Sequence, residues 1–207
     1  GSWLGVVDGR SSILFATVAG VSMTLMSGRQ SPPTGDELVR TRLRLLVRAA
    51  LIYVIGSLLN VAGAPIAIIL EYYALCMAFS LIVLSWSWKR LAVLAAVLAV
   101  VGPLFQRALG DLLLQAPGGG TFTDLLVLGY YPVITWFTFF AVGMALGRAG
   151  ADRPVVQRRA LLIGAGCAVV GYSVAAVLPA EVSSPDAGLG MIGWDSIFSS
   201  APHSGGI

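Results

Sequence analysis

Glu71 is the clearest case in this sequence of an ionisable residue inside an apolar stretch. It stands in the apolar and aromatic run Ile-Ile-Leu-Glu-Tyr-Tyr at residues 68–73. An ionisable side chain at membrane depth is costly and is by default a functional hypothesis. If a helix begins at Pro65, Glu71 lies about 9 Å along it. We predict either a carboxylate that lines a polar cavity or one that reaches the interface or hydrogen-bonds to a neighbouring helix.

A second pair of candidates, Asp8 and Arg10, places an acid and a base two residues apart. They precede an apolar stretch, and Ser11 and Ser12 follow them directly. Serine caps helix N-termini and a carboxylate suits the positive end of the helix dipole, which gives a structural interpretation. Alternatively, Asp8 and Arg10 form the charged floor of a pocket on the extracytoplasmic side.

His203 is the only histidine, in the run Pro-His-Ser-Gly at 202–205. It is either an ordinary solvated loop residue or an acid/base catalyst, since histidine transfers protons near neutral pH. One histidine and two cysteines inside apolar runs, Cys76 and Cys167, do not provide the ligand spacing of a metal site. We therefore expect no metal.

The composition predicts the elements that position these residues. Of the 207 residues, 57% are hydrophobic and 11% are charged, whereas a soluble domain carries about 25% charged residues. A water-soluble fold of this size could not bury so much apolar surface. The net charge of +3 comes without a basic stripe interleaved with aromatics, so no nucleic acid is expected as a partner. The predicted fold is an all-α bundle of transmembrane helices in the lipid bilayer.

Six stretches approach the roughly 20 apolar residues that a spanning helix needs. They form one predicted transmembrane domain over residues 1–207, with spans near 11–26, 45–62, 65–86, 91–105, 125–146 and 160–178.

The basic residues predict the orientation of these spans. Of the 13 lysines and arginines, 11 lie in the first, third and fifth connections, and only Arg10 and Arg107 lie elsewhere. The positive-inside rule then makes residues 27–44, 87–90 and 147–159 cytoplasmic in a multi-pass plasma-membrane protein.

Small residues predict close helix packing. Gly143 and Gly147 form a GxxxG pattern in the fifth span, and Gly164, Gly166 and Gly171 occur in the sixth. Such faces let helix backbones approach each other, within the chain or in a homo- or hetero-oligomer.

The sequence resembles the bacterial membrane proteins that are similar to heparan-α-glucosaminide N-acetyltransferase, a group of polytopic acyltransferases common in actinobacteria. Five patches carry the resemblance: residues 3–12 with 19–22, residues 40–51, residues 69–73, residues 131–132 with 136 and 141–148, and residues 202–205. The family carries an additional preceding helix with a catalytic histidine, and further helices after the Pro-His-Ser-Gly patch. The resemblance therefore implies that this chain is a segment of a longer protein.

The resemblance implies an enzyme of the cell envelope that moves an acyl group from a cytoplasmic acyl-CoA to an extracytoplasmic acceptor, often a sugar. In this interpretation His203, Asp8 and Glu71 are catalytic, and Arg10, Trp3 and Tyr72 contact the substrate. Arg10 would stabilise the oxyanion while an acid/base group activates the acceptor. Two alternatives stay open: a non-catalytic subunit that packs against proteins or lipids, and a transporter in which Glu71 is the coupling carboxylate.

Overall fold

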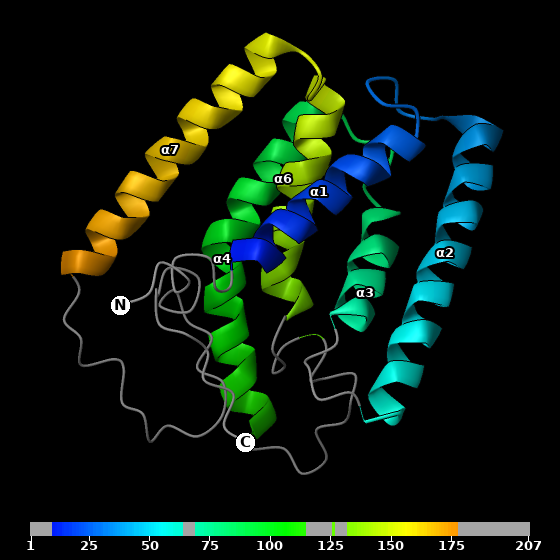
Figure 1. Cartoon of the computed structure of the whole chain (residues 1–207), viewed down its shortest axis with the longest axis horizontal. Helices are drawn as coiled ribbons and strands as arrows, with labels where there is room; N and C mark the ends of the chain where they lie inside the picture. Colours follow the sequence, from blue (N-terminus) through cyan, green and yellow to red (C-terminus); the bar gives the residue numbers. More distant parts are fainter. Residues whose placement is uncertain (1–9, 64–68, 115–125, 127–131, 178–207) are drawn as a thin grey trace.

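The described part of the chain is entirely helical in a computed structural model that describes residues 10–63, 69–114, 126 and 132–177. This confirms the all-α prediction for these residues. The six helices, shown in Figure 1, are α1 (Arg10–Met26), α2 (Gly35–Val61), α3 (Leu70–Ser80), α4 (Trp88–Leu114), α6 (Val133–Ala149) and α7 (Pro154–Val177).

Helix α6 is the centre of the bundle. It packs against α1 and against α4, while α3 packs against α2. Its side chains Phe140 and Met144 are fully buried, as is Met23 of α1. Half or more of the α6 residues are buried, because other described helices cover it from more than one side (Figure 1).

Glycines permit the crossing of α1 and α6. A Cβ at Gly20 would overlap with the Phe140 carbonyl oxygen, and one at Gly143 would overlap with the Thr17 carbonyl oxygen. A Cβ at Gly147 would collide with the hydroxyl of Thr24. The predicted GxxxG face is therefore confirmed as a packing face, and its partner is α1 of the same chain.

The expected continuous span over residues 65–86 is not found. Helix α3 ends at Ser80 after 11 residues, about 16 Å, and turns occupy residues 81–85. Arg42 of α2 explains how the helix can end there: its Nε donates to the Leu81 carbonyl oxygen at 2.9 Å and its Nη2 donates to that of Ile82 at 3.4 Å. An arginine thus satisfies carbonyl groups that the end of a helix leaves without an internal donor.

Among the described residues, two helices are long and apolar enough to cross a membrane: α2, and residues Trp88–Gln106 of α4. The shorter apolar helices are Ser12–Met26 and Val133–Ala149. Many large apolar side chains on these helices are exposed, for example Leu58 at 64% and Val93 at 63%. Such an exterior is consistent with a membrane protein, whereas six complete spans are not established by these helices.

The three basic connections meet at one end of the bundle. Residues 27–34, 81–87 and 150–153 lie together near the top of Figure 1. Arg153 donates to the Gln30 side-chain oxygen at 2.5 Å, which joins the first connection to the last. Within these ranges only Arg29 and Arg153 are basic, because the helices begin earlier or end later than the predicted spans. The other basic residues of this group lie in the adjoining helix ends: Arg40, Arg42, Arg44 and Arg48 in α2, Lys89 and Arg90 in α4, Arg148 in α6, and Arg158 and Arg159 in α7.

Helix α7 has few contacts with the rest of the described structure (Figure 1). No described atom lies within 4 Å of a Cβ built at Gly164 or at Gly166. The expected close approach through these two glycines therefore does not occur among the described residues.

Candidate functional site

Helices α1, α3 and α6 meet around Tyr73, away from the connections 27–34, 81–87 and 150–153. The Tyr73 hydroxyl of α3 donates a hydrogen bond to the Phe15 carbonyl oxygen of α1 at 2.8 Å. The two rings also pack at a centroid distance of 4.9 Å, and Tyr73 lies edge-on to Phe140 of α6 at 6.0 Å. These aromatic contacts hold the three helices together at this point.

A small cavity lies where these three helices meet. Its volume is about 10 Å³, room for roughly one water molecule. Its wall is almost entirely apolar and aromatic and consists of Ala16, Ile69, Tyr72, Tyr73, Cys76, Trp136 and Phe140. Tyr72, a predicted substrate contact, is thus part of a recess that three helices form.

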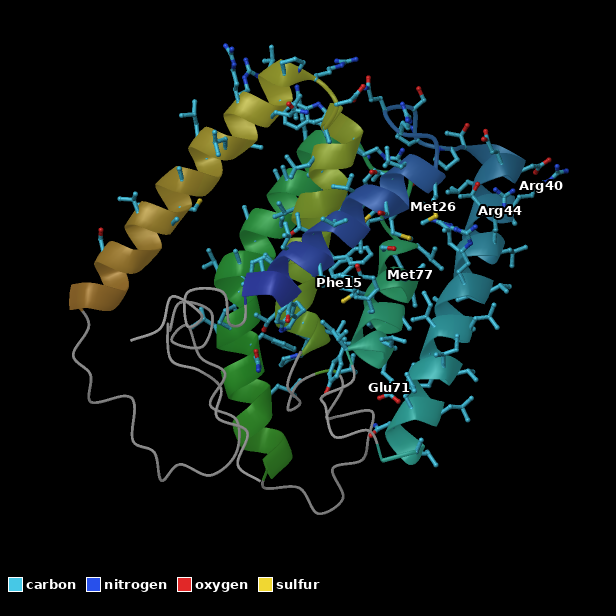
Figure 2. The ribbon with its side chains drawn as sticks, in the orientation of Figure 1. Phe15, Met26, Arg40, Arg44, Glu71 and Met77 are labelled. Atoms are coloured by element: carbon cyan, nitrogen blue, oxygen red, sulfur yellow. The ribbon has the colours of Figure 1, made fainter. Side chains whose placement is uncertain are left out.

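Glu71 does not line this cavity. It is 5% exposed and packs against α2, where a Cβ at Gly56 would lie 2.9 Å from the Glu71 Cγ. Figure 2 shows its carboxylate between α3 and the end of α2. Successive residues of a helix point about 100° apart, so Glu71 faces α2 while Tyr72 faces the cavity. The structure therefore does not bring these two predicted site residues together.

Gly56 has no side chain and therefore leaves the space that Glu71 occupies against α2. Leu70 also lies close to Gly56, with its Cβ 3.0 Å from a Cβ built there. No hydrogen bond or ion pair joins the Glu71 carboxylate to another described residue. A buried carboxylate beside a glycine fits both interpretations that the sequence left open, a contact with a neighbouring helix and a polar cavity wall.

The other predicted site residues lie at or beyond the edge of the described structure. Arg10 is the first residue of α1, and only its backbone is described. Trp3, Asp8 and His203 lie outside the described residues. Their approach to the cavity stays a prediction. No group of three or more His, Cys, Asp or Glu residues that could hold a metal ion occurs in the described part of the chain.

Arg148 is a buried arginine that the sequence analysis treated only as a cytoplasmic charge. Its Nη1 donates to the carbonyl oxygens of Ser27, at 3.0 Å, and Arg29. Its Nη2 donates to the Ser27 hydroxyl at 3.1 Å and to the Leu84 carbonyl oxygen at 2.7 Å. One side chain of α6 thus joins the connections 27–34 and 81–87. The sequence feature that indicated burial of Arg148 is its position directly after Gly147 of the GxxxG packing face.

Those hydrogen bonds hold an unusual turn after α1. Gly28 and Arg29 both have a positive φ, 90° and 52°, which an arginine adopts only at a cost in free energy. The guanidinium of Arg148 binds carbonyl oxygens on both sides of Gly28, so it stabilises this conformation. Gly150, with a φ of 93°, ends α6 in the same region.

A polar seam between α4 and α6 was also missed. The Thr135 hydroxyl donates to the Gln106 side-chain oxygen at 2.5 Å, and both residues are buried. One turn further along α6, the buried Thr138 hydroxyl has no hydrogen-bond partner among the described residues. Polar residues within apolar helices often form hydrogen bonds across helix interfaces. The presence of Gln106 and Thr135 in apolar stretches was therefore the sequence feature that could have predicted this contact.

A larger crevice lies at the basic end. It has a volume of about 290 Å³ and combines apolar with charged residues: Val21, Leu25, Arg29, Gln30, Gly147, Ala151 and Asp152. The two ends of the bundle therefore differ chemically. One region holds a narrow aromatic cavity, and the other holds a wider crevice in which Arg29 and Asp152 are the charged residues.

The fold and these two ends define a helical protein whose apolar exterior is consistent with a membrane protein. The chain belongs to the heparan-alpha-glucosaminide N-acetyltransferase family, because the model of that family's catalytic domain matches residues 2–174. This confirms the resemblance that the sequence patches predicted. No curated protein and no solved structure matches the chain.

Membership of the family indicates acetyltransferase-like activity at a membrane. The family is membrane-associated and depends on acetyl-CoA, which agrees with the predicted acyl-CoA donor.

Proposed function

We propose that the protein is a multi-pass membrane acyltransferase that moves an acyl group from a cytoplasmic acyl-CoA to a sugar-like acceptor on the extracytoplasmic side. The observation that carries this proposal is the match of the catalytic-domain family over residues 2–174. In this proposal the basic connections are cytoplasmic, and the ends of α1, α3 and α6 near Tyr72 face the other side.

The chemical difference between the two ends supports this direction of transfer. Phosphate groups of an acyl-CoA bind well to guanidinium groups, and Arg29 lines the crevice at the basic end. Aromatic side chains at the opposite end, with Tyr72 and Trp136 in the cavity wall, provide the surface on which an acceptor would pack. Along α6, Trp136 and Phe140 of the cavity wall lie 11 and 7 residues, or about 16 Å and 10 Å, from Gly147 of the crevice.

The proposed reaction needs a general base, a donor for the oxyanion and an acid that protonates the leaving thiol. A base removes a proton from the acceptor hydroxyl or amine as its oxygen or nitrogen attacks the thioester carbonyl carbon. A donor stabilises the oxyanion until the C–S bond breaks and the thiol leaves with a proton. We assign the acid/base role to Asp8 and His203, the oxyanion contact to Arg10 and substrate contacts to Trp3 and Tyr72. Glu71 is the third proposed catalytic residue and, with Asp8, the second carboxylate.

The test uses the protein in proteoliposomes, with labelled acetyl-CoA on the side of the basic connections and glucosamine as the probe acceptor on the other side. We expect labelled product, and a rate at least about 100-fold lower in Asp8→Asn and in His203→Ala, as for loss of a general acid or base. The matched control is Asp36→Asn, an exposed carboxylate in the first turn of α2 that lines neither the cavity nor the crevice. Full rates in both site variants, with normal membrane insertion, would refute the assignment.

Glu71→Gln separates the two interpretations of the buried carboxylate. The amide has nearly the same shape and keeps the contact with Gly56. If Glu71 takes part in catalysis, the rate falls while the thermal midpoint of the purified protein stays the same. An unchanged rate would assign Glu71 to helix packing alone.

A further inference from the structure

Three arginines repeat at four-residue spacing along α2. Arg40, Arg44 and Arg48 are all exposed, and Figure 2 shows Arg40 and Arg44 at the basic end of this helix. Residues four apart share a helix face, so these three form one arginine stripe. Like charges at this spacing repel each other and destabilise the helix slightly. A negatively charged partner would offset this repulsion.

That partner is not provided by the described residues. The one hydrogen bond of Arg48 goes from Nη1 to the Met26 sulfur at 2.7 Å, and a thioether is a weak acceptor. By contrast, Arg42 on the neighbouring face reaches two carbonyl oxygens. No carboxylate in the described part of the chain pairs with Arg40, Arg44 or Arg48. Most of the donors of the stripe remain free for an anion.

The surroundings of the stripe identify the kind of anion. Large apolar side chains flank it and are more than half exposed: Leu43 58%, Val47 58% and Leu51 58%. A soluble phosphate would cover the guanidinium groups and leave this apolar surface in water. A phospholipid covers both, because its head group is charged and its chains are apolar.

The depth of the stripe also fits a lipid. From Arg40 to Arg48 the helix rises about 12 Å, which leads from the end of the bundle into its apolar zone. The long arginine side chains keep their charged ends at the interface while their stems pack along apolar surface. Met26, 39% exposed at the end of α1, adds an apolar contact beside Arg48.

We propose that Arg40, Arg44 and Arg48 form a binding site for the phosphate of an anionic phospholipid, whose acyl chains pack along the exposed apolar residues of α2. This site does not depend on the proposed acyl transfer. It predicts a preference for lipid head groups with a net negative charge over zwitterionic ones.

The experiment is native mass spectrometry of the purified protein with phosphatidylglycerol and with phosphatidylcholine of the same chain composition. We expect tighter binding of phosphatidylglycerol to the unchanged protein. In the double variant Arg44→Gln and Arg48→Gln, its affinity falls about 25-fold, or about fivefold for each arginine removed. The double variant Arg44→Lys and Arg48→Lys keeps the charge, and its affinity stays within a few-fold of the original.

The matched control is Arg158→Gln with Arg159→Gln, which removes the same charge from exposed positions near the start of α7. If basic residues at this end attract anionic lipid without a site, both double variants lose affinity equally and the proposal fails. It also fails if the unchanged protein binds both lipids equally.

A further arm adds coenzyme A as a soluble phosphate compound. Displacement of phosphatidylglycerol by coenzyme A, lost in the stripe variant, would assign the stripe to a soluble ligand and overturn the lipid assignment. If the double glutamine variant does not fold, Arg40→Gln alone serves, since this exposed side chain makes no hydrogen bond to a described residue. We then expect a loss of about fivefold, and an unchanged affinity would contradict the proposal.

Discussion

Helices α6 and α7 are both apolar and both contain spaced glycines, yet they occupy opposite environments. In α6, Gly143 and Gly147 lie against α1, and ten of its 17 residues are buried. In α7, Gly164 and Gly166 have no described atom within contact distance, and Leu161 and Leu162 are more than 70% exposed. The two helices differ in what surrounds them far more than in composition.

This difference shows what a small-residue pattern can and cannot predict. Glycine spacing indicates that a helix can be approached closely, because no side chain keeps the other backbone away. Whether another helix uses that face depends on the shape and position of the partner. Since α1 already occupies the GxxxG face of α6, an oligomer through glycine faces would have to use α7.

The largest effect that tests this comparison is the replacement of Gly143 by leucine. Even the Cβ of the new side chain would overlap with the backbone of α1 at Thr17. We expect the free energy of unfolding to fall by about 3 kcal/mol or more, at the upper end of overpacking effects. Gly164→Leu, with open space around it, is the matched control and changes the thermal midpoint little. Equal midpoints for the two variants would show that the crossing of α1 and α6 is wrong.

Removal of the Arg148 guanidinium is the next largest change. In Arg148→Gln, the carbonyl oxygens of Ser27, Arg29 and Leu84 lose their common donor. Hydrogen bonds to charged groups stabilise by about 1.5–3 kcal/mol, so we expect a loss within that range. Arg148→Lys should retain only part of this stability, because an ammonium lacks the planar set of donors of a guanidinium.

The control for Arg148 is Arg158→Gln, an exposed arginine of α7. Its effect on the thermal midpoint should be small, as for most surface substitutions. Similar losses in both arginine variants would mean that charge at this end, rather than the hydrogen bonds of Arg148, stabilises the connections 27–34 and 81–87.

The smallest effects compare two threonines of α6. Thr135→Val removes the hydrogen bond to Gln106, and we expect a loss of about 1 kcal/mol in the free energy of unfolding. Thr138→Val replaces a buried hydroxyl without a described partner by a methyl group, so the change should be near zero or stabilising. A large loss at Thr138 alone would point to a polar partner outside the described residues.

The candidate site was only partly predictable. The sequence analysis assigned Glu71 and Tyr72 to the same site, because they are adjacent in one apolar run. In the helix they face different neighbours, α2 and the aromatic cavity. Arg148 was missed for the opposite reason: charge counting assigns every arginine near a helix end to the surface, and only the fold shows that carbonyl oxygens surround this one.

The sequence by itself determined the helical class, the family and the grouping of the basic residues, because composition and charge pattern are read along the chain and each helix satisfies its own backbone. The length of α3 and the division of roles between Glu71 and Tyr72 were decided only in three dimensions. Arg42, 39 positions away in the sequence, donates to the Leu81 carbonyl oxygen at the end of α3, and Gly56 of α2 leaves the space that Glu71 occupies. Such contacts depend on which helices become neighbours, which no local pattern encodes.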